Sequence, residues 1–483
     1  MQTLVILRIL GLLLMVFSVT MLPPVAIDFI YQENKSAPFI NAFMLILGFG
    51  MLLFLPLYKQ KKELRLRDGF MIVVMFWVVL GSVGGLPLYL SADDQLSVTD
   101  AIFESISGLT TTGATVIVGL DELPHSILFY RQFLQWLGGM GIIVLAVAVL
   151  PMLGIGGMQL YRAEMPGPVK DTKLTPRITE TAKALWYIYL GLTITCGVAY
   201  WLAGMNAFDA VGHAFSTVAI GGFSTHDASI GYFQNTGIEL IAIVFMLLSG
   251  VNFALHFTAF RRRRLTPYLK DAEFGTYILI LSTVSLITIG YLHFSETFDS
   301  AQESVIEGLF QVVSIGTTTG FTTQEYYAWP GFLPVLLLYV SYIGGCAGST
   351  GGGIKVIRIL LLVKQGAREL RRLVHPSAQF AVKIGRKPVP NNVIEAVWGF
   401  FAAYFAISAL MILLLMASGL NQDTAFSAVA ACLNNLGPGL DEVGQNFAHI
   451  NDFAKWVLCV AMLLGRLEIF TLLVLLTPGF WRK

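Results

Sequence analysis

Charged residues are scarce in this sequence, because Asp, Glu, Lys and Arg make up 13% of its 483 residues while 55% are hydrophobic. A chain this poor in charge lacks the polar surface of an ordinary soluble protein. Its formal net charge of +1 also argues against a nucleic-acid-binding protein, which would need a basic surface. The composition therefore predicts a polytopic membrane protein.

Cysteine is also rare, and the four cysteines show neither metal-ligand spacing nor a paired extracellular framework. They lie in or beside apolar segments, which predicts packing roles. The sequence contains no recognisable Ser/His/Asp arrangement, catalytic carboxylate pair or metal cluster, so we do not expect an enzyme. A proton relay is an alternative use of the titratable residues in or near the apolar segments, which are Glu104, Asp209, His213, His226 and His256.

Ten apolar stretches are each long enough to cross a bilayer. They are residues 4–30, 39–57, 70–90, 127–153, 184–202, 238–260, 277–292, 332–362, 393–417 and 453–476. All but four of the 31 lysines and arginines fall on one side of the resulting topology, the exceptions being Lys35, Arg131, Lys455 and Arg466. Positive charge concentrates on the cytoplasmic side, so both termini are predicted to be cytoplasmic.

A short pattern recurs four times, at residues 110–113 (TTTG), 219–222 (AIGG), 317–320 (TTTG) and 434–437 (NNLG). Each copy follows a short semi-amphipathic segment, expected at 100–109, 209–218, 307–316 and 423–433, and precedes a long apolar one. Internal repeats of this kind reveal the architecture. We predict an all-α polytopic membrane protein with four pseudo-symmetric repeats around a central pore. Each repeat is a helix, a pore helix with its filter, and a second helix.

Two extra transmembrane helices precede the repeats in this scheme. The predicted boundaries are 1–68 for the leading helices, and 69–160, 161–264, 265–375 and 376–483 for the four repeats. The topology places all four tetrapeptides toward the outer face.

The tetrapeptides have the composition of an ion filter. A half-helix that enters from outside and stops midway directs the partial negative charge of its carboxyl end at the membrane centre, where it stabilises a dehydrated cation. Glycine permits the backbone angles that turn carbonyls inward, and carbonyl rings can replace an ion's hydration shell. Ile220 and Leu436 stand where other copies have threonine. This favours coordination by backbone carbonyls over a side-chain site.

A glycine-rich segment, residues 344–353 (GGCAGSTGGG), interrupts the apolar stretch after the third tetrapeptide. So many glycines disfavour a rigid helix, which predicts a loop below the filter that obstructs the pathway. Close helix packing through small residues is the alternative. A phosphate-binding loop is not expected, because Gly353-Ile354-Lys355-Val356 does not supply the Gly-Lys-Ser/Thr sequence.

Arg466 is an ionisable residue inside the last apolar stretch. Such a residue is a functional candidate by default. We predict that it faces the pore below the filter and meters cations there. The alternative is an ion pair with Glu468 or a bond to a carbonyl.

Several segments resemble the TrkH/TrkG potassium-uptake proteins of bacteria, a family within the superfamily that also holds the KtrB and plant HKT transporters. The segments include FESISGLTTTGAT, AIGGFSTHDASIGYF, GGCAGSTGGGIKVIRILL and LGRLEIFTLL. The resemblance runs from end to end. It implies a pore with one potassium path per subunit, a homodimer in the bacterial inner membrane in contact with lipid, and a cytosolic nucleotide-binding regulatory subunit resembling TrkA.

Positions carried over from the family give the expected site. The resemblance implies ion-lining residues at Thr111, Thr112, Ile220, Gly221, Thr318, Thr319, Asn435 and Leu436, and filter glycines at Gly113, Gly222, Gly320 and Gly437. It implies a gate formed by Gly344, Gly345, Ser349, Thr350, Gly351, Gly352, Gly353 and Arg466. Superfamily members that favour sodium tend to carry serine in place of the first glycine, so potassium is the expected ion, and rubidium could also pass.

These observations lead to a potassium-conducting pore, driven by the membrane potential and binding no nucleotide in this chain. An ion-coupled secondary transporter, moving protons or sodium with potassium, is the main alternative. A membrane scaffold without conduction is a third. The basic segments Arg261–Arg264 and 364–372 are candidate docking surfaces for the regulatory subunit.

Overall fold

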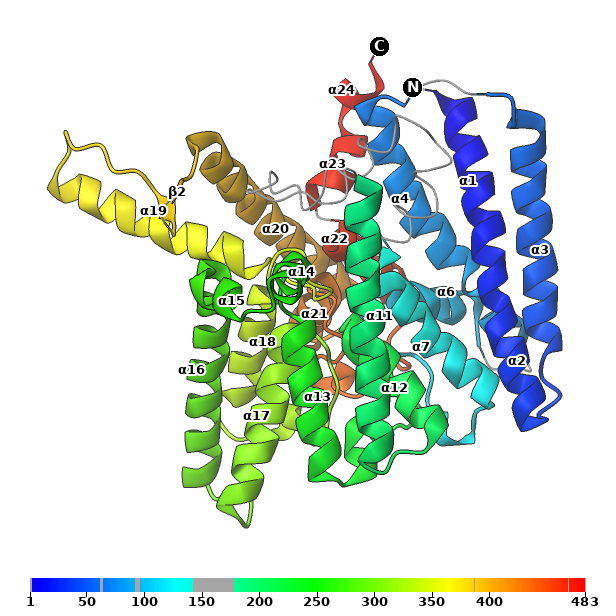
Figure 1. Ribbon diagram of the computed structural model, residues 1–483, viewed down its shortest axis with the longest axis horizontal. Helices are drawn as coiled ribbons and strands as arrows, with labels where there is room; N and C mark the ends of the chain where they lie inside the picture. The colour runs from blue at the N-terminus through cyan, green and yellow to red at the C-terminus, as the bar shows by residue number, and fades with distance from the viewer. Residues whose placement is uncertain are drawn as a thin grey trace.

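The computed structural model describes residues 2–60, 64–91, 96–141, 178–385, 387–467 and 469–482. These residues form a bundle of α-helices, as the composition predicted (Figure 1). The strands found in them are β1 (Lys383–Ile384) and β2 (Lys387–Pro388), which pair antiparallel.

Two leading helical segments lie side by side at one edge of the bundle (Figure 1). The first is α1 (Thr3–Ser18), which continues through a 3-10 turn at Val19–Met21 into α2 (Leu22–Tyr31); the second is α3 (Ala37–Phe54), followed by a 3-10 turn at Leu55–Leu57. An ideal Cβ on Gly11 would lie 2.8 Å from the Gly50 carbonyl oxygen. The helices therefore cross at glycines, which is a common way for membrane helices to approach closely.

The order of long helix, short helix, non-helical segment and helix recurs four times after this pair. The first repeat holds α4 (Leu66–Val83), α5 (Leu86–Ser91), α6 (Val98–Leu109) and α7 (His125–Gly139), and the second holds α11 (Ile178–Leu202), α12 (Ala207–Ala219), α13 (Thr236–Ser249), α14 (Phe253–Arg262) and α15 (Thr266–Lys270). The third holds α16 (Ala272–Phe294), α17 (Ala301–Thr317), α18 (Leu333–Ile343) and α19 (Val356–Val374), and the fourth holds α20 (Asn391–Ala417), α21 (Gln422–Leu433), α22 (Asp452–Leu467), α23 (Ile469–Leu476) and α24 (Pro478–Trp481). Short 3-10 turns follow the filters at Leu120–Glu122, Ser229–Phe233, Tyr326–Ala328 and Asp441–Val443. The repeat boundaries given above stay a prediction.

The ten expected spans are not all continuous helices. Six helices or joined helix runs in the described residues are long and apolar enough to cross a membrane, and two bent helix pairs raise this to eight. The continuous span expected over 238–260 is wrong, because α13 and α14 meet at 94° across Gly250 to Asn252. The stretch 332–362 is broken between α18 and α19, as the glycines predicted. The stretch 127–153 begins with α7 but leaves the described residues after Gly141.

The four short helices that precede the tetrapeptides are α6, α12, α17 and α21, and they begin in the same way. A Ser or Asn at the N-cap accepts a hydrogen bond from a backbone N–H in the first turn, at Ser97, Asn206, Ser300 and Asn421. Such a cap satisfies one of the free N–H groups of the helix start. The third short helix begins at Ala301, six residues before the expected start at Glu307, because Ser300 is its cap. The N-cap of the second short helix is Asn206, whose side chain accepts from Asp209 N.

Both chain ends lie at the same end of the bundle, and the turn between α16 and α17 lies at the opposite end (Figure 1). Helix α19 and the β1–β2 hairpin project away from the bundle. The arrangement agrees with termini on one membrane side, while their cytoplasmic location stays a prediction.

Candidate functional site

All four short helices end in the same backbone turn. The residue two positions before each filter glycine has a left-handed backbone, with φ of 55° at Thr111, 55° at Ile220, 70° at Thr318 and 53° at Asn435. Its N–H donates to the carbonyl three residues earlier, and the next N–H donates to the carbonyl five residues before it, at 2.8–3.2 Å throughout. This is a Schellman cap, which normally uses glycine.

Three of these four left-handed residues are β-branched, which is an unfavourable choice for positive φ. Each such residue stores about 1–3 kcal/mol of strain and persists only where the surroundings fix it. The turn reverses the chain so that each helix ends at the tetrapeptide, and the partial negative charge of its carboxyl end lies there. Four separate segments therefore reach the same strained conformation, at the positions where the repeats predicted filters.

The four filter glycines form a closed ring. Each one faces the carbonyl oxygen of the residue that precedes the next repeat's glycine. An ideal Cβ on Gly113 would lie 2.1 Å from the Gly221 oxygen. The distance is also 2.1 Å from an ideal Cβ on Gly222 to the Thr319 oxygen and from one on Gly320 to the Leu436 oxygen. It is 2.8 Å from an ideal Cβ on Gly437 to the Thr112 oxygen. Since all four glycines also have φ between 77° and 99°, both the space and the backbone require glycine. The structure thus brings together all the predicted filter residues, and these are buried or nearly so.

Side chains of the filters bond to one another and to a surrounding helix. Thr112 Oγ1 lies 2.7 Å from Thr110 Oγ1, and Thr319 Oγ1 lies 2.8 Å from Thr317 Oγ1. In the fourth repeat, Asn435 Nδ2 donates to Thr112 Oγ1 at 2.9 Å and to the Met462 carbonyl at 3.0 Å. These side chains brace the backbone, which leaves its carbonyls as the groups that all four filters share.

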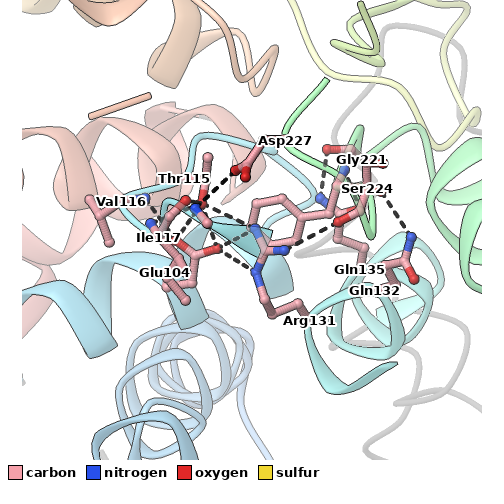
Figure 2. Close-up of polar contacts among 12 residues, drawn as sticks. Glu104, Thr115, Val116, Ile117, Arg131, Gln132, Gln135, Gly221, Ser224 and Asp227 are labelled. Carbon is pink, nitrogen blue, oxygen red and sulfur yellow. Dashed lines mark hydrogen bonds and ion pairs between the residues drawn. The ribbon is translucent and has the colours of Figure 1, made fainter. Parts of the chain in front are cut away.

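A buried ion pair lies beside the first two filters (Figure 2). Arg131 on α7 is 1% exposed, and its Nε donates to Glu104 Oε1 of α6 at 2.8 Å. The same guanidinium reaches the Ser224 carbonyl at 3.2 Å, just past the second filter. Glu104 also accepts from the backbone N–H of Val116 at 2.9 Å, just past the first. The pair therefore fastens two neighbouring repeats together, and the sequence had left Arg131 without a role.

The glycine-rich loop between α18 and α19 packs against three filters. Gly352 N donates to Thr318 Oγ1 at 2.7 Å, Gly353 N donates to the Asn434 carbonyl at 2.9 Å, and Thr350 Oγ1 donates to the Val218 carbonyl at 2.9 Å. An ideal Cβ on Gly352 would lie 2.0 Å from the Asn434 oxygen. These glycines therefore allow close approach of the loop to the filter backbone. The segment is a loop, as predicted, and not the close helix packing considered as the alternative, while a gating role stays a prediction.

The remaining residues predicted for the gate lie within the same loop. An ideal Cβ on Gly344 would lie 2.2 Å from the Gly352 oxygen, and one on Gly345 would lie 2.7 Å from Ser349 Oγ. An ideal Cβ on Gly351 would lie 2.9 Å from the Thr317 carbonyl oxygen. The loop thus folds back on itself beneath the filters.

Arg466 connects this loop to the first repeat. Its Nη1 donates to the Thr350 carbonyl at 3.0 Å, and its Nη2 donates to the Gly138 carbonyl of α7 at 2.7 Å. Gly138 in turn packs against the end of α6, since an ideal Cβ there would lie 1.8 Å from the Leu109 oxygen. The carbonyl contacts match the alternative considered for Arg466; Glu468 lies outside the described residues.

The loops after the first two filters are joined by a histidine. His226 donates through Nδ1 to Asp121, contacts Asp209 Oδ2 through Nε2 at 3.4 Å, and stacks on Tyr232 with ring centroids 3.4 Å apart. Asp227 strengthens the joint by accepting from Gly119 N and Leu120 N at 3.2 and 2.9 Å.

We expect this joint to weaken as the pH rises. Burial lowers the pKa of His226, but its bonds to Asp209 and Asp121 outweigh burial and raise the pKa above its ordinary value. A raised pKa adds stability below the unfolded value of about 6.5, and this stability is lost as the pH rises through the folded value. Asp121 is largely exposed, so the contribution stays below about 1 kcal/mol. The melting temperatures of the parent protein and His226→Gln should differ more at pH 5.5 than at pH 8.5, and a pH-independent difference would contradict this.

Sequence reasoning missed Gln135 of α7, whose side chain contacts the second filter. Its Nε2 donates to the Gly221 carbonyl at 2.6 Å, and its Oε1 accepts from Phe223 N at 3.0 Å. The available signal was a polar cluster in an apolar stretch, at Arg131, Gln132 and Gln135. Its target could not be read from the sequence, because the partners lie 86 and 88 residues away.

Comparison with known proteins gives consistent relationships over the whole chain. Residues 35–482 match the family TrkH, described as cation transport protein. The Trk system potassium uptake protein TrkH of Vibrio parahaemolyticus is 61% identical over 480 residues, covering 99% of both chains. The TrkG protein of Escherichia coli, of the same description, is 44% identical over 473 residues, covering 98% of this chain and 97% of that one. The crystal structure of the potassium transporter TrkH from Vibrio parahaemolyticus superposes with a TM-score of 0.91, at 58% identity and full coverage of both chains.

Proposed function

The chain belongs to the TrkH family of cation transport proteins, and from this we propose that it is a potassium-selective, channel-like uptake protein of the bacterial inner membrane. The closed ring of four filter glycines and neighbouring carbonyls carries the proposal. Rings of backbone carbonyls replace the hydration shell of a potassium ion. The relatives named above are potassium uptake proteins. Uptake is driven by the membrane potential, which contributes about 2.3 kcal/mol per charge for each 100 mV.

The test is the reversal potential of the purified protein in a planar bilayer. A potassium gradient is applied first, and an opposing pH or sodium gradient is then added. A reversal potential that follows potassium alone supports a selective pore. A shift with the second gradient would establish ion-coupled transport instead, and the histidine and carboxylate network around His226 and Asp209 would become its candidate path.

We further propose that the loop Gly344–Gly353 is the gate, because it packs against three filters and Arg466 ties it to α7 of the first repeat. A nucleotide-binding regulatory subunit resembling TrkA would control it from the cytoplasm. The exposed basic residues at the end of α14, Arg261–Arg264, and the projecting helix α19 are surfaces on which such a subunit could dock. The assembly is proposed to be a homodimer.

The loop is also anchored on its cytoplasmic side, by Glu273 in the first turn of α16. One carboxylate oxygen of Glu273 accepts from Ala347 N at 2.7 Å, inside the loop, and from Ile357 N at 3.2 Å, at the start of α19. Because the Glu273 side chain is buried, water does not compete for these hydrogen bonds. Glu273 therefore links the loop and the start of α19 to α16, the helix that follows the basic segment of α14 and α15.

Replacing Glu273 by alanine should release the loop. The two lost hydrogen bonds contribute about 0.5–1.5 kcal/mol each, so the open population should increase by about tenfold. Cys346 in the loop is 1% exposed and serves as the reporter. In a background with alanine at Cys196, Cys432 and Cys459, the rate of thiol modification at Cys346 should rise by that factor. Glu395→Ala, which removes an exposed carboxylate on α20, is the control, and equal rates in both variants would contradict the anchoring role.

A further inference from the structure

The second filter differs from the other three in lacking a side chain at the position before its glycine. That position is Thr112 in the first repeat, Thr319 in the third and Leu436 in the fourth, but Gly221 in the second. In the first and third repeats the threonine hydroxyl braces the filter by bonding to the threonine two residues earlier. The second tetrapeptide, Ala-Ile-Gly-Gly, has no polar side-chain atom. It cannot brace itself in this way.

The side chain of Gln135 occupies the place that this missing side chain would take (Figure 2). An ideal Cβ on Gly221 would lie 2.4 Å from Gln135 Cδ, so a side chain at position 221 and the Gln135 side chain cannot both occupy this space. The Gln135 amide spans the filter turn, donating to the Gly221 carbonyl at 2.6 Å and accepting from Phe223 N at 3.0 Å. Gln135 is 0% exposed. The brace of the second filter therefore comes from α7 of the first repeat.

The Gly221 carbonyl is also a member of the ring, because it is the oxygen that faces Gly113. A carbonyl oxygen has two lone pairs, so the amide N–H can take one while the other stays available. The bond fixes the direction of this carbonyl, and the donor's partial positive charge weakens the field that the oxygen presents to an ion. The number and field strength of coordinating carbonyls are among the quantities that set selectivity between potassium and sodium.

We infer that Gln135 is a specificity-determining positioning residue, which supplies the second filter with its missing brace and sets the Gly221 carbonyl of the ring. The inference rests on the proposed function as a potassium filter. It concerns Gln135 in particular, because its neighbours contact the chain beyond the ring. Gln132 Nε2 donates to the Phe223 carbonyl at 3.2 Å, and Arg131 Nη1 donates to the Ser224 carbonyl at 3.2 Å.

The test compares Gln135→Leu with the parent protein by measuring reversal potentials under potassium on one side and sodium on the other. Loss of one neutral hydrogen bond at the ring should lower the potassium-to-sodium permeability ratio by about fivefold. Gln132→Leu is the matched control. It removes the same amide from the same face of α7, and its side chain fills a similar notch at Gly212. Its permeability ratio should stay that of the parent.

If Gln135→Leu does not yield a monodisperse protein, Gln135→Glu replaces it. This variant keeps the shape but exchanges the donor nitrogen for an acceptor oxygen, and the ratio should fall in the same direction. An unchanged ratio in a folded Gln135 variant would overturn the inference. An equal fall in Gln132→Leu would also overturn it, because the effect would then belong to α7 packing. A parent protein that does not discriminate potassium from sodium would instead contradict the proposed function.

Discussion

Substituting serine for Gly113 is expected to remove most of the preference for potassium over sodium. The new Cβ would lie 2.1 Å from the Gly221 carbonyl oxygen, and the residue would have to keep a φ of 82°. Backbone strain of this kind costs about 1–3 kcal/mol, and the ring relieves it by moving the carbonyl. We expect the permeability ratio to fall by at least about tenfold, the factor that corresponds to about 1.4 kcal/mol.

The control for this experiment is Gly119→Ser. Gly119 also has a positive φ, of 79°, but a Cβ there would meet nothing within 4 Å. The two variants therefore share the backbone strain and differ in the contact with the ring. Reversal potentials under potassium and sodium should separate them. A scaffold that does not conduct would be indifferent to both substitutions, and equal behaviour of the two variants would contradict the filter assignment.

Substituting alanine for Arg466 is expected to raise potassium flux by about tenfold or more. The variant loses bonds to the Thr350 and Gly138 carbonyls, which hold the glycine-rich loop beneath the filters. Hydrogen bonds from a charged donor contribute about 1.5–3 kcal/mol each, and an unfastened loop should leave the pathway more often. Potassium entry into proteoliposomes, followed with an ion-sensitive dye, measures the change.

Arg466→Lys distinguishes the two roles that the arginine could have. Lysine keeps the charge near the pathway but cannot reach two carbonyls with one planar group. If charge alone limits cation flow, the flux of this variant should stay low. If fastening of the loop limits it, the flux should rise as in Arg466→Ala. Arg482→Ala, at an exposed site near the chain end, should leave the flux unchanged, and an unchanged flux in Arg466→Ala would contradict the gating role of the loop.

Local sequence features predicted the positions of the filters and of the interrupting loop. The tetrapeptides and the glycines at 344–353 are contiguous, so composition and spacing suffice to find them. The expected helix starts were less reliable, since the third half-helix is capped by Ser300 and begins before Glu307. Apolar composition was also insufficient to predict that a span is one continuous helix. The stretch 238–260 is mostly apolar, yet α13 and α14 meet at 94°, because hydropathy records composition and not direction.

The sequence by itself determined that this protein is a helical membrane protein with four recurring tetrapeptides that follow short helices, because burial in lipid and helix termination depend on neighbouring residues. Only the tertiary structure decided that the four segments close into one ring, that Arg466 fastens the loop, and that Gln135 replaces the side chain absent at Gly221. These contacts join residues 86 to 328 positions apart. No local pattern specifies them, because they depend on how helices from different repeats pack against one another.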